Sequence, residues 1–522
     1  MRQIMKNYKI SSLLPPILFL AFSAIFALFF SRNFVWAAGM SHDSVLYMNG
    51  AKSLLAGEGY PHTHFPPLYP AALALTAFIT NQDVISSATL LAVLLYGMNG
   101  FLAGWLIWRL KGSLLGGLGV ISVFALLPGI VRLHFEAMSE PLFFSMLFLT
   151  FICLMEYLKN GWLKWALLAG LSAGLAALTR YIAVYLIAAV PLTVFIFDKN
   201  PMKKRFTHTF MAGVAGLFPP AAWWLSNQIS KGTVTNRSFV FHPKDLEFFQ
   251  NGWGSFAELI GTQFITKWTL RLPGFIFTIC AYVIVALIVY FTVKYFIKGK
   301  PAPLSRTFTL ICLISLVLYV LALWFSVTFV DDSTMLTARI ISPIFIQLFL
   351  CIWILFWPAR QTQVSNPSRL LLSFLVLLIM FVNLPGYLEV TRTFRKDGFL
   401  FTGRAWSTSS TLSWLSQVPD SIPIYTNENI PLGFFTAHPA YSLPERKSVS
   451  SGVPNPSFKN SNEKMINEIR DGKALMIIFT RNKYSELYQS KEILVENLEK
   501  CLTFEDSEVY TGGAYFREYC AQ

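Results

Sequence analysis

The chain has 522 residues, of which 54% are hydrophobic and 13% are charged, and its formal net charge is +14. A soluble domain of this length does not expose so much apolar surface, so the composition excludes a soluble globular protein and indicates a polytopic membrane protein. Bases in cytoplasmic turns beside anionic lipid headgroups account for the positive charge, and they give no support to nucleic-acid binding.

Apolar runs recur along the chain as far as about residue 390. Because the hydrocarbon core of a bilayer needs roughly 20 apolar residues per helix, we expect about eleven transmembrane helices. They cover residues 12–36, 84–108, 113–131, 140–158, 162–179, 181–197, 206–227, 273–293, 307–330, 338–357 and 369–386. The first run is too long for a signal-peptide core, and we expect it to remain as an anchor. The predicted fold class is an all-α polytopic membrane domain over residues 1–389.

Lys and Arg gather in alternate loops, and this bias sets the predicted orientation. With a cytoplasmic N-terminus, the basic stretches at 199–205 and 294–306 lie in cytoplasmic loops. Residues 37–83, the 228–272 loop and the region after 390 then lie on the outer face of a plasma (inner) membrane. We expect the chemistry of the protein on that face.

The first outer loop is unusually rich in acid and histidine. It contains SHDSVLYMNGAKSLLAGEGYPHTHFPPLYP, in which Asp43 opens a short interfacial helix that Gly57 and Gly59 stop. Two interpretations of Asp43 remain open, a helix N-cap and a catalytic carboxylate at membrane depth. The next run, HFPPLYPAALALTAFI, is too short to span comfortably and predicts a re-entrant or half-buried helix.

Further charged residues are predicted on the same side. Glu136 and Glu140 lie at the outer end of the fourth span, and Arg180 lies at an outer turn. An ionised group near the bilayer centre costs about 3 kcal/mol or more, so charged groups at membrane depth usually pair or serve function. Snorkelling to the interface is the alternative role for Arg180.

The region from 390 to 522 predicts a small extracytoplasmic α/β domain. Helices are expected at AWSTSSTLSWLSQV and KEILVENLEKCL, and strands at IPIYTN and ALMIIF. The Thr-Gly-Gly at 511–513 predicts a hairpin turn. Cys501 and Cys520 flank this hairpin in an oxidising compartment, and we predict a disulfide between them.

Taken in order, these motifs resemble the type-C superfamily of membrane glycosyltransferases. The nearest branch contains the protein O-mannosyltransferases (dolichyl-phosphate-mannose-protein mannosyltransferase-like) and the aminoarabinose transferases. The matching motifs are the first-loop acid, PPLYPAALAL, SEPLF at a span entrance and AGLAALTRY. Further on, KGTVTNRSFVFHP and VDDSTMLTARIISPIF look like later outer loops of the family, and IYTNENIPLGFFTAHPAYSLP looks like the tail domain of some bacterial members.

The resemblance implies transfer of a sugar from a polyprenyl-phosphate donor to a protein, lipid or glycan acceptor, with inversion at the anomeric centre. The family's first-loop base falls on Asp43 by position. Many relatives carry two adjacent acids there, whereas the neighbours here are His42 and Ser44. Either one acid suffices, or Glu140 supplies the second.

The predicted chemistry needs a base and a cation. A carboxylate that removes the proton of an acceptor hydroxyl contributes about 100- to 10,000-fold in rate. The lipid-linked phosphate that leaves must be held by a cation, and guanidinium presents paired donors to phosphate oxygens. Arg180 and Arg339 are the first candidates, and Arg132 is the third.

Other polar residues are assigned to substrate contacts. These are Tyr69, Asp332, His62 and His64. The two histidines have the alternative of only ordering the turn before Pro66. A divalent metal held by His42, Asp43, His62 and His64 is possible but disfavoured, because neither a His-x-x-x-His spacing nor a Cys pair supports it. We therefore predict no cofactor.

Other protein classes remain as alternatives. A lipid-linked glycan ligase or polymerase shares the substrate class, but the 228–272 loop has only Arg237, His242 and Arg271 in support. A polytopic transporter should show paired repeats with ionisable residues near the midplane, and no repeat is evident. A non-catalytic assembly subunit remains if Asp43 is only a cap.

Overall fold

The computed structural model describes most of the chain. The described residues are 2–235, 239–261, 304–331, 333–358, 366–447, 453–480, 495 and 498–512.

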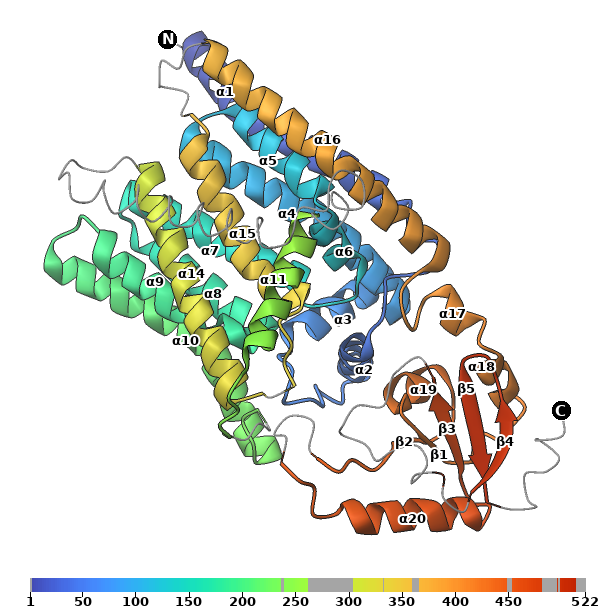
Figure 1. Ribbon diagram of the computed structural model, residues 1–522. Helices are drawn as coiled ribbons and strands as arrows, with labels where there is room; N and C mark the ends of the chain where they lie inside the picture. Colours follow the sequence, from blue (N-terminus) through green and yellow to red (C-terminus); the bar gives the residue numbers. More distant parts are fainter. Residues whose placement is uncertain are drawn as a thin grey trace.

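The apolar runs of the sequence form a bundle of long helices (Figure 1). Each predicted span coincides with a helix or an adjoining pair, except 273–293, which lies outside the described residues. The helices are α1 (Arg2–Ser31), α4 (Val84–Lys111), α5 (Leu114–Leu126), α6 (Pro128–Phe135), α7 (Glu140–Asn160), α8 (Leu163–Thr179), η1 (Tyr181–Ala183), α9 (Val184–Phe197), α10 (Met202–Lys231), α14 (Leu304–Phe329), α15 (Ala338–Phe356) and α16 (Asn366–Asp397). Helix α11 (Leu246–Ile260) lies in the predicted 228–272 loop.

Six of the described helices are long and apolar enough to cross a membrane. They are α1 from residue 14, α4, α7, α14, α15 and α16 from residue 372. Helices α5 and α6 form one further candidate with a 65° bend. Pro128 starts α6, and a proline disfavours helical backbone at the residue before it, which accounts for the break at Leu127. The chain is thus a multi-pass membrane protein, while the predicted number of about eleven spans is not confirmed.

Helices α8 and α10 approach each other closely. Gly170 and Gly174 of α8 face the backbone of α10, where an added Cβ would collide with the carbonyls of Ala212 and Gly216. Small residues allow such close contact between helices in membranes. This packing fixes the end of α8, where Arg180 is the C-cap residue.

Two short helices lie between the bundle and the C-terminal part of the chain (Figure 1). They are α2 (His42–Leu55) and α3 (Leu68–Thr80), as the first-loop pattern predicts. Helix α2 ends before Gly57, whose φ of 77° favours glycine. Met48 of α2 shares a buried apolar core with Leu432 of the C-terminal part. The loop helices are therefore packed from both sides.

The chain after α16, which we call the C-terminal unit, contains a five-stranded mixed sheet in the order β2-β1-β3-β5-β4. Strand β1 is parallel to β2 and β3, and β5 is antiparallel to β3 and β4. The predicted strands at IPIYTN and ALMIIF are β1 and β3. The elements are α17 (Arg404–Ser407), α18 (Ser410–Leu415), β1 (Ile424–Thr426), α19 (Asn429–Phe435), β2 (Ala440–Ser442), α20 (Phe458–Arg470), β3 (Leu475–Phe479), β4 (Glu499–Thr503) and β5 (Ser507–Thr511).

One local prediction in the C-terminal unit is wrong at its end, and another is not tested. Strand β4 occupies the end of the stretch 491–502 that we predicted to be helical. A hairpin turn at 504–506 joins β4 to β5. The predicted Thr-Gly-Gly hairpin starts at Thr511, the last residue of β5, and the chain after residue 512 lies outside the described residues, so that hairpin stays a prediction. Pairing with β5 is a tertiary contact, and it outweighs the local helical pattern at residues 499–502.

Candidate functional site

The first turn of α2 presents Asp43 without using it as a cap. Ser41 is the N-cap residue, and it forms a capping box with Ser44. The backbone N–H of Ser41 donates to Ser44 Oγ at 3.0 Å. The interpretation of Asp43 as the N-cap is therefore wrong, because a serine two residues earlier already has that role. The Asp43 carboxylate is left to contact other helices.

Asp43 belongs to a group of two acids and two arginines that we call the charge cluster: Asp43, Glu140, Arg180 and Arg339. The Nη1 and Nη2 atoms of Arg339 donate to Asp43 Oδ2 at 3.2 and 3.1 Å. Its Nε donates to Glu140 Oε1 at 2.7 Å. Arg180 pairs with the same oxygen of Glu140. The ends of α2, α7, α8 and α15 thus meet at one cluster, in which two acids face two bases.

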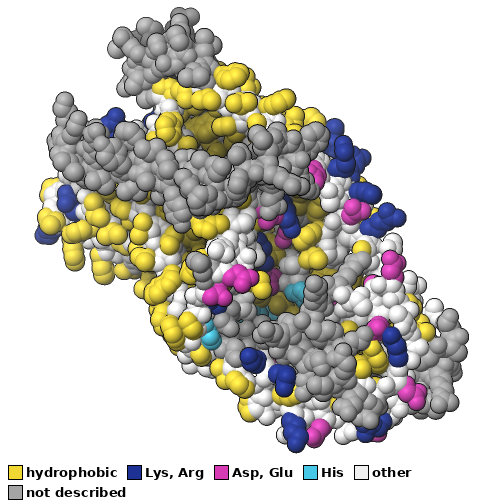
Figure 2. Space-filling model, viewed as in Figure 1, with side chains coloured by type: hydrophobic (Ala, Val, Ile, Leu, Met, Phe, Trp, Pro, Cys, Tyr) yellow, Lys and Arg dark blue, Asp and Glu magenta, His cyan; other side chains and the backbone are white. Residues whose placement is uncertain are grey.

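Exposure changes across the charge cluster. The exposed fraction of the side chain is 1% for Glu140, 12% for Arg180, 27% for Arg339 and 34% for Asp43. A buried carboxylate is costly unless cations compensate it, and two guanidinium groups do so for Glu140. Asp43 is the open end of the cluster. Figure 2 shows acidic and basic side chains gathered near the centre of that view, beside the apolar surface of the bundle.

Backbone contacts bring the two acids of the charge cluster together. The N–H of Gly39 donates to the carbonyl of Phe135 at 2.8 Å, and the N–H of Ala137 donates to the carbonyl of Gly39 at 2.8 Å. A Cβ at Gly39 would lie 2.9 Å from the Cβ of Phe399, so the close approach requires glycine. The segment before Asp43 is thereby held beside the segment before Glu140.

Tyr47 lies beneath Asp43, one turn later in α2, and our sequence analysis did not select it. Its hydroxyl oxygen is 3.4 Å from Ser139 Oγ. Burial, followed by the negative charges of Asp43 and Glu140, raises the pKa of Tyr47. The i, i+4 spacing from Asp43 is the signal that identifies it. The predicted contact residue Tyr69 is buried against Tyr47, with ring centroids 5.2 Å apart.

Arg132 is not part of the charge cluster. It pairs with Glu258 of α11, and its Nε is 3.9 Å from Glu136 Oε1. We call these three residues the Arg132 cluster. Burial raises the pKa of Glu136 to about 7, although Arg339 and Arg132 act to lower it. Arg132 pairs elsewhere because α11 supplies an acid from far along the sequence.

The predicted histidines lie together near the end of α10. The ring centroids of His62 and His64 are 5.4 Å apart. Burial, His64 and Lys231 lower the pKa of His62 to about 4, although a backbone hydrogen bond opposes them. Lys231, which our sequence analysis did not select, donates to the carbonyl of Tyr60 at 2.6 Å. The imidazole of His62 is therefore neutral at pH 7.

The four residues considered for a metal do not converge. The Nε2 of His42 contacts Glu428 in the C-terminal unit, whereas Asp43 contacts Arg339. Within the described ranges, no group of three His, Cys, Asp or Glu side chains is arranged to hold a metal ion.

One predicted site residue and one cysteine of the predicted disulfide lie outside the described residues. Asp332 is not among the described residues. Cys501 is disulfide-bonded. Its predicted partner Cys520 lies outside the described residues, so the pairing stays a prediction.

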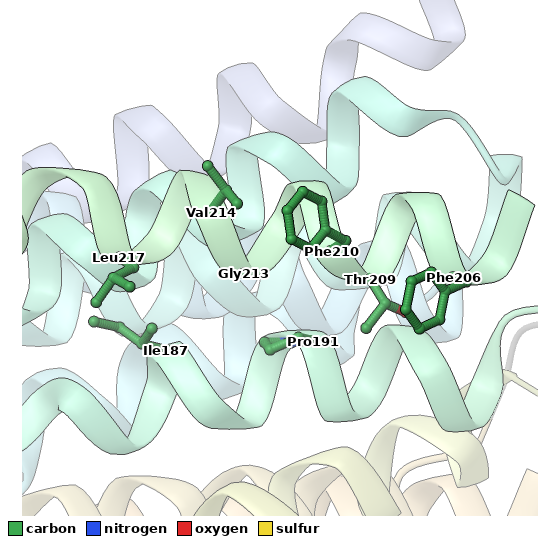
Figure 3. A pocket seen from close by; sticks show the side chains of 8 residues that line it. All are labelled: Ile187, Pro191, Phe206, Thr209, Phe210, Gly213, Val214 and Leu217. Atoms are coloured by element: carbon green, nitrogen blue, oxygen red, sulfur yellow. The ribbon is translucent and has the colours of Figure 1, made fainter.

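An apolar groove of about 440 Å³ lies between α9 and α10 (Figure 3). Ile187 and Pro191 of α9 lie opposite Phe210 and Leu217 of α10. Its lining contains none of the predicted site residues. Such a lining is typical of a surface in contact with hydrocarbon chains.

The chain is similar to known proteins in part of its sequence and in its fold. The model of the family described as dolichyl-phosphate-mannose-protein mannosyltransferase matches residues 64–224. This segment contains Glu140 and Arg180 of the charge cluster. No curated protein gives a significant match.

Two solved structures of ArnT from Cupriavidus metallidurans are similar over 95% of this chain and 98% of ArnT. One is bound to undecaprenyl phosphate and has a TM-score of 0.58 at 12% identity. The other is in the apo state and has a TM-score of 0.55 at 12% identity. The chain therefore has the fold of ArnT and resembles, as its motifs predict, the type-C superfamily of membrane glycosyltransferases in its protein O-mannosyltransferase and aminoarabinose transferase branch.

Proposed function

We propose that this chain is an integral membrane glycosyltransferase that moves a sugar from a polyprenyl-phosphate donor to an acceptor at the outer membrane face. The observation that carries the proposal is the charge cluster, which is buried at Glu140 and open at Asp43. The match to a mannosyltransferase family and the fold shared with an undecaprenyl-phosphate-bound ArnT support the substrate class.

Asp43 is the general base of the proposed reaction. Its carboxylate takes the proton of an acceptor hydroxyl while the hydroxyl oxygen forms a bond to the anomeric carbon. The bond from that carbon to the phosphate oxygen breaks, and the phosphate leaves with the electron pair. A single displacement of this kind inverts the anomeric centre. No second acid is required, because the leaving group is already a stable anion.

Arg339 links the base to the donor phosphate. Its two Nη atoms face Asp43, while its Nε is committed to buried Glu140. A donor phosphate that binds these Nη atoms competes with Asp43 for them. Because an opposing charge stabilises the ionised form of a carboxylate, sharing the arginine makes Asp43 a better proton acceptor. Donor binding and activation of the base are thereby coupled through one guanidinium group.

Glu140 has an anchoring role in this scheme, and it does not exchange protons with substrate. Its side chain is 1% exposed, and its Oε1 holds both Arg180 and Arg339. Its other oxygen, Oε2, is buried without a hydrogen-bond partner among the described side chains and backbone. One acid, Asp43, therefore serves as the base, and Glu140 fixes the two cations that receive the phosphate.

The finer topology is part of the proposal. Lys and Arg in alternate loops support a cytoplasmic N-terminus, and with about eleven spans they support an extracytoplasmic α/β domain at the C-terminus. The charge cluster lies at helix ends, which fits a site at the outer interface of the plasma membrane. A transporter is less well supported, because its ionisable residues belong near the midplane.

The substrate class is tested with purified protein in nanodiscs. Undecaprenyl phosphate binding is measured by native mass spectrometry, and a panel of undecaprenyl-phosphate-linked radiolabelled hexoses and pentoses is supplied with isolated membranes as the acceptor source. We expect saturable binding of undecaprenyl phosphate and transfer from at least one donor. Absence of both binding and transfer would contradict the proposal.

A further inference from the structure

The C-terminal unit contacts α2 directly beside Asp43. The Nε2 of His42 is 2.6 Å from Glu428 Oε2. His42 is the residue before Asp43, and Glu428 is the residue before α19. The ring of His42 also packs edge-on against Phe401, with ring centroids 5.0 Å apart. A carboxylate 386 positions away in the sequence is thus joined to the neighbour of the proposed base.

The two side chains of this pair differ in burial. The exposed fraction of the Glu428 side chain is 4%, against 41% for His42. A buried carboxylate is stabilised only where hydrogen-bond donors compensate it, and the His42 ring supplies such an N–H donor to Glu428. The position of α2 relative to the C-terminal unit is therefore fixed by a contact with the buried Glu428 carboxylate, although His42 itself is partly exposed.

The same unit holds the other end of α2 and the segment before it. The Nζ of Lys52 lies 3.7 Å from the centroid of the Phe434 ring, a cation–π contact. The N–H of Phe401 donates to the carbonyl of Met40 at 3.1 Å. The hydroxyl of Thr402 donates to the carbonyl of Ala38 at 2.8 Å. The C-terminal unit thus contacts α2 before its start, at its first turn and in its last turn.

We propose that Glu428 is a positioning residue for the transfer reaction: by binding His42 it fixes the first turn of α2, and so directs Asp43 toward Arg339 and the acceptor. This inference rests on the proposed function. Arg339 holds Asp43 from the membrane side, and Glu428 holds its neighbour from the C-terminal unit. A base in proton transfer must stay within hydrogen-bond reach of the acceptor hydroxyl, so a small rotation of α2 lowers the rate.

Glu428→Gln is the main test, because it keeps the shape of the side chain and removes its charge. We expect kcat for transfer to fall about 10- to 100-fold, with the KM for the undecaprenyl-phosphate sugar changed by less than about twofold. Undecaprenyl phosphate binding should be unchanged. Hydrogen–deuterium exchange of the amides in the first turns of α2 should be faster than in the wild type.

Glu508→Gln is the matched control. Glu508 also accepts from a base across a short distance, since the Nζ of Lys500 is 2.9 Å from its Oε1 within the same sheet. We expect it to leave kcat and the exchange of α2 unchanged. A loss of kcat in Glu508→Gln equal to that in Glu428→Gln would overturn the proposal, because the effect would then belong to the stability of the whole unit.

A double-mutant cycle with His42→Ala separates coupling from two independent losses. Because both changes remove the same contact, Glu428→Gln combined with His42→Ala should be no slower than the slower single variant. Multiplied losses would overturn the proposal. If the wild type transfers no sugar and binds no undecaprenyl phosphate, the proposed function fails. The exchange experiment then still decides whether Glu428 holds α2, since unchanged exchange would overturn that part.

Discussion

Two clusters of acids and arginines lie at helix ends of this protein, and they differ in the exposure and in the pairing of their side chains. In the charge cluster, Glu140 is 1% exposed and Arg339 binds two acids. In the Arg132 cluster, the Arg132 side chain is 50% exposed and that of its partner Glu258 is 25% exposed, while Glu136 is 10% exposed and 3.9 Å from Arg132. Coulombic interactions are screened at exposed sites and strong at buried ones. The charge cluster, whose arginines pair with a buried acid, is therefore expected to carry function, and the exposed Arg132–Glu258 pair to contribute mainly to packing between α6 and α11.

Replacing the arginine in each cluster by lysine should separate them most strongly. Lysine keeps the charge but cannot bind Asp43 and Glu140 with a planar fork. We expect Arg339→Lys to lower sugar transfer at least about 100-fold. Arg132→Lys should stay within about fivefold of the wild type. Equal losses in the two variants, measured as initial transfer rates in nanodiscs, would remove the distinction.

The second-largest effect is expected on folding stability, when one acid is removed from each cluster. Glu140→Gln leaves Arg180 and Arg339 without their shared buried carboxylate, and breaking a buried pair costs about 3–5 kcal/mol. Glu258→Gln should cost less than about 1 kcal/mol, because its partner Arg132 is half exposed. The apparent melting temperature of the purified variants checks this order. A larger decrease for Glu258→Gln would show that burial does not govern the two clusters.

The smallest expected effect concerns pH and Glu136, the buried acid of the Arg132 cluster. Its pKa in the folded protein is raised to about 7, above the ordinary value of 4.5. Between these values the unfolded chain is ionised while the folded protein holds the proton, so stability falls as pH rises through this window. Glu136→Gln lacks this decrease. The difference between its melting temperature and that of the wild type should therefore increase from pH 5 to about pH 7 and stay constant above that pH. A constant difference over this range would contradict the assignment.

The sequence predicted the helices and the sidedness of the site because both depend on local patterns. Apolar runs of suitable length identified the long helices, and their ends placed Asp43, Glu140 and Arg180 on one side. Arg339 was selected because its guanidinium group can present paired donors to a phosphate. Its bridging of two acids was not predictable, since no pattern in the sequence relates the start of α15 to the start of α2.

Features that depend on distant partners were the ones that sequence analysis missed. Arg132 meets Glu258 through the packing of α11 on α6, and His42 meets Glu428 through the docking of the C-terminal unit. In β4, pairing with β5 overrode a helical pattern. The alternative in which Asp43 is the N-cap is excluded by a local feature, because Ser41 takes that role two positions earlier.

Transfer activity of Asp43→Asn tests the central claim most directly. The matched control is Asp83→Asn, because Asp83 caps α4 by accepting from the N–H groups of Ile85 and Ser86, and asparagine retains that role. We expect Asp43→Asn to lose about 100- to 10,000-fold in transfer rate while it still binds undecaprenyl phosphate. Asp83→Asn should keep both activities. Wild-type transfer by Asp43→Asn would contradict its assignment as the base.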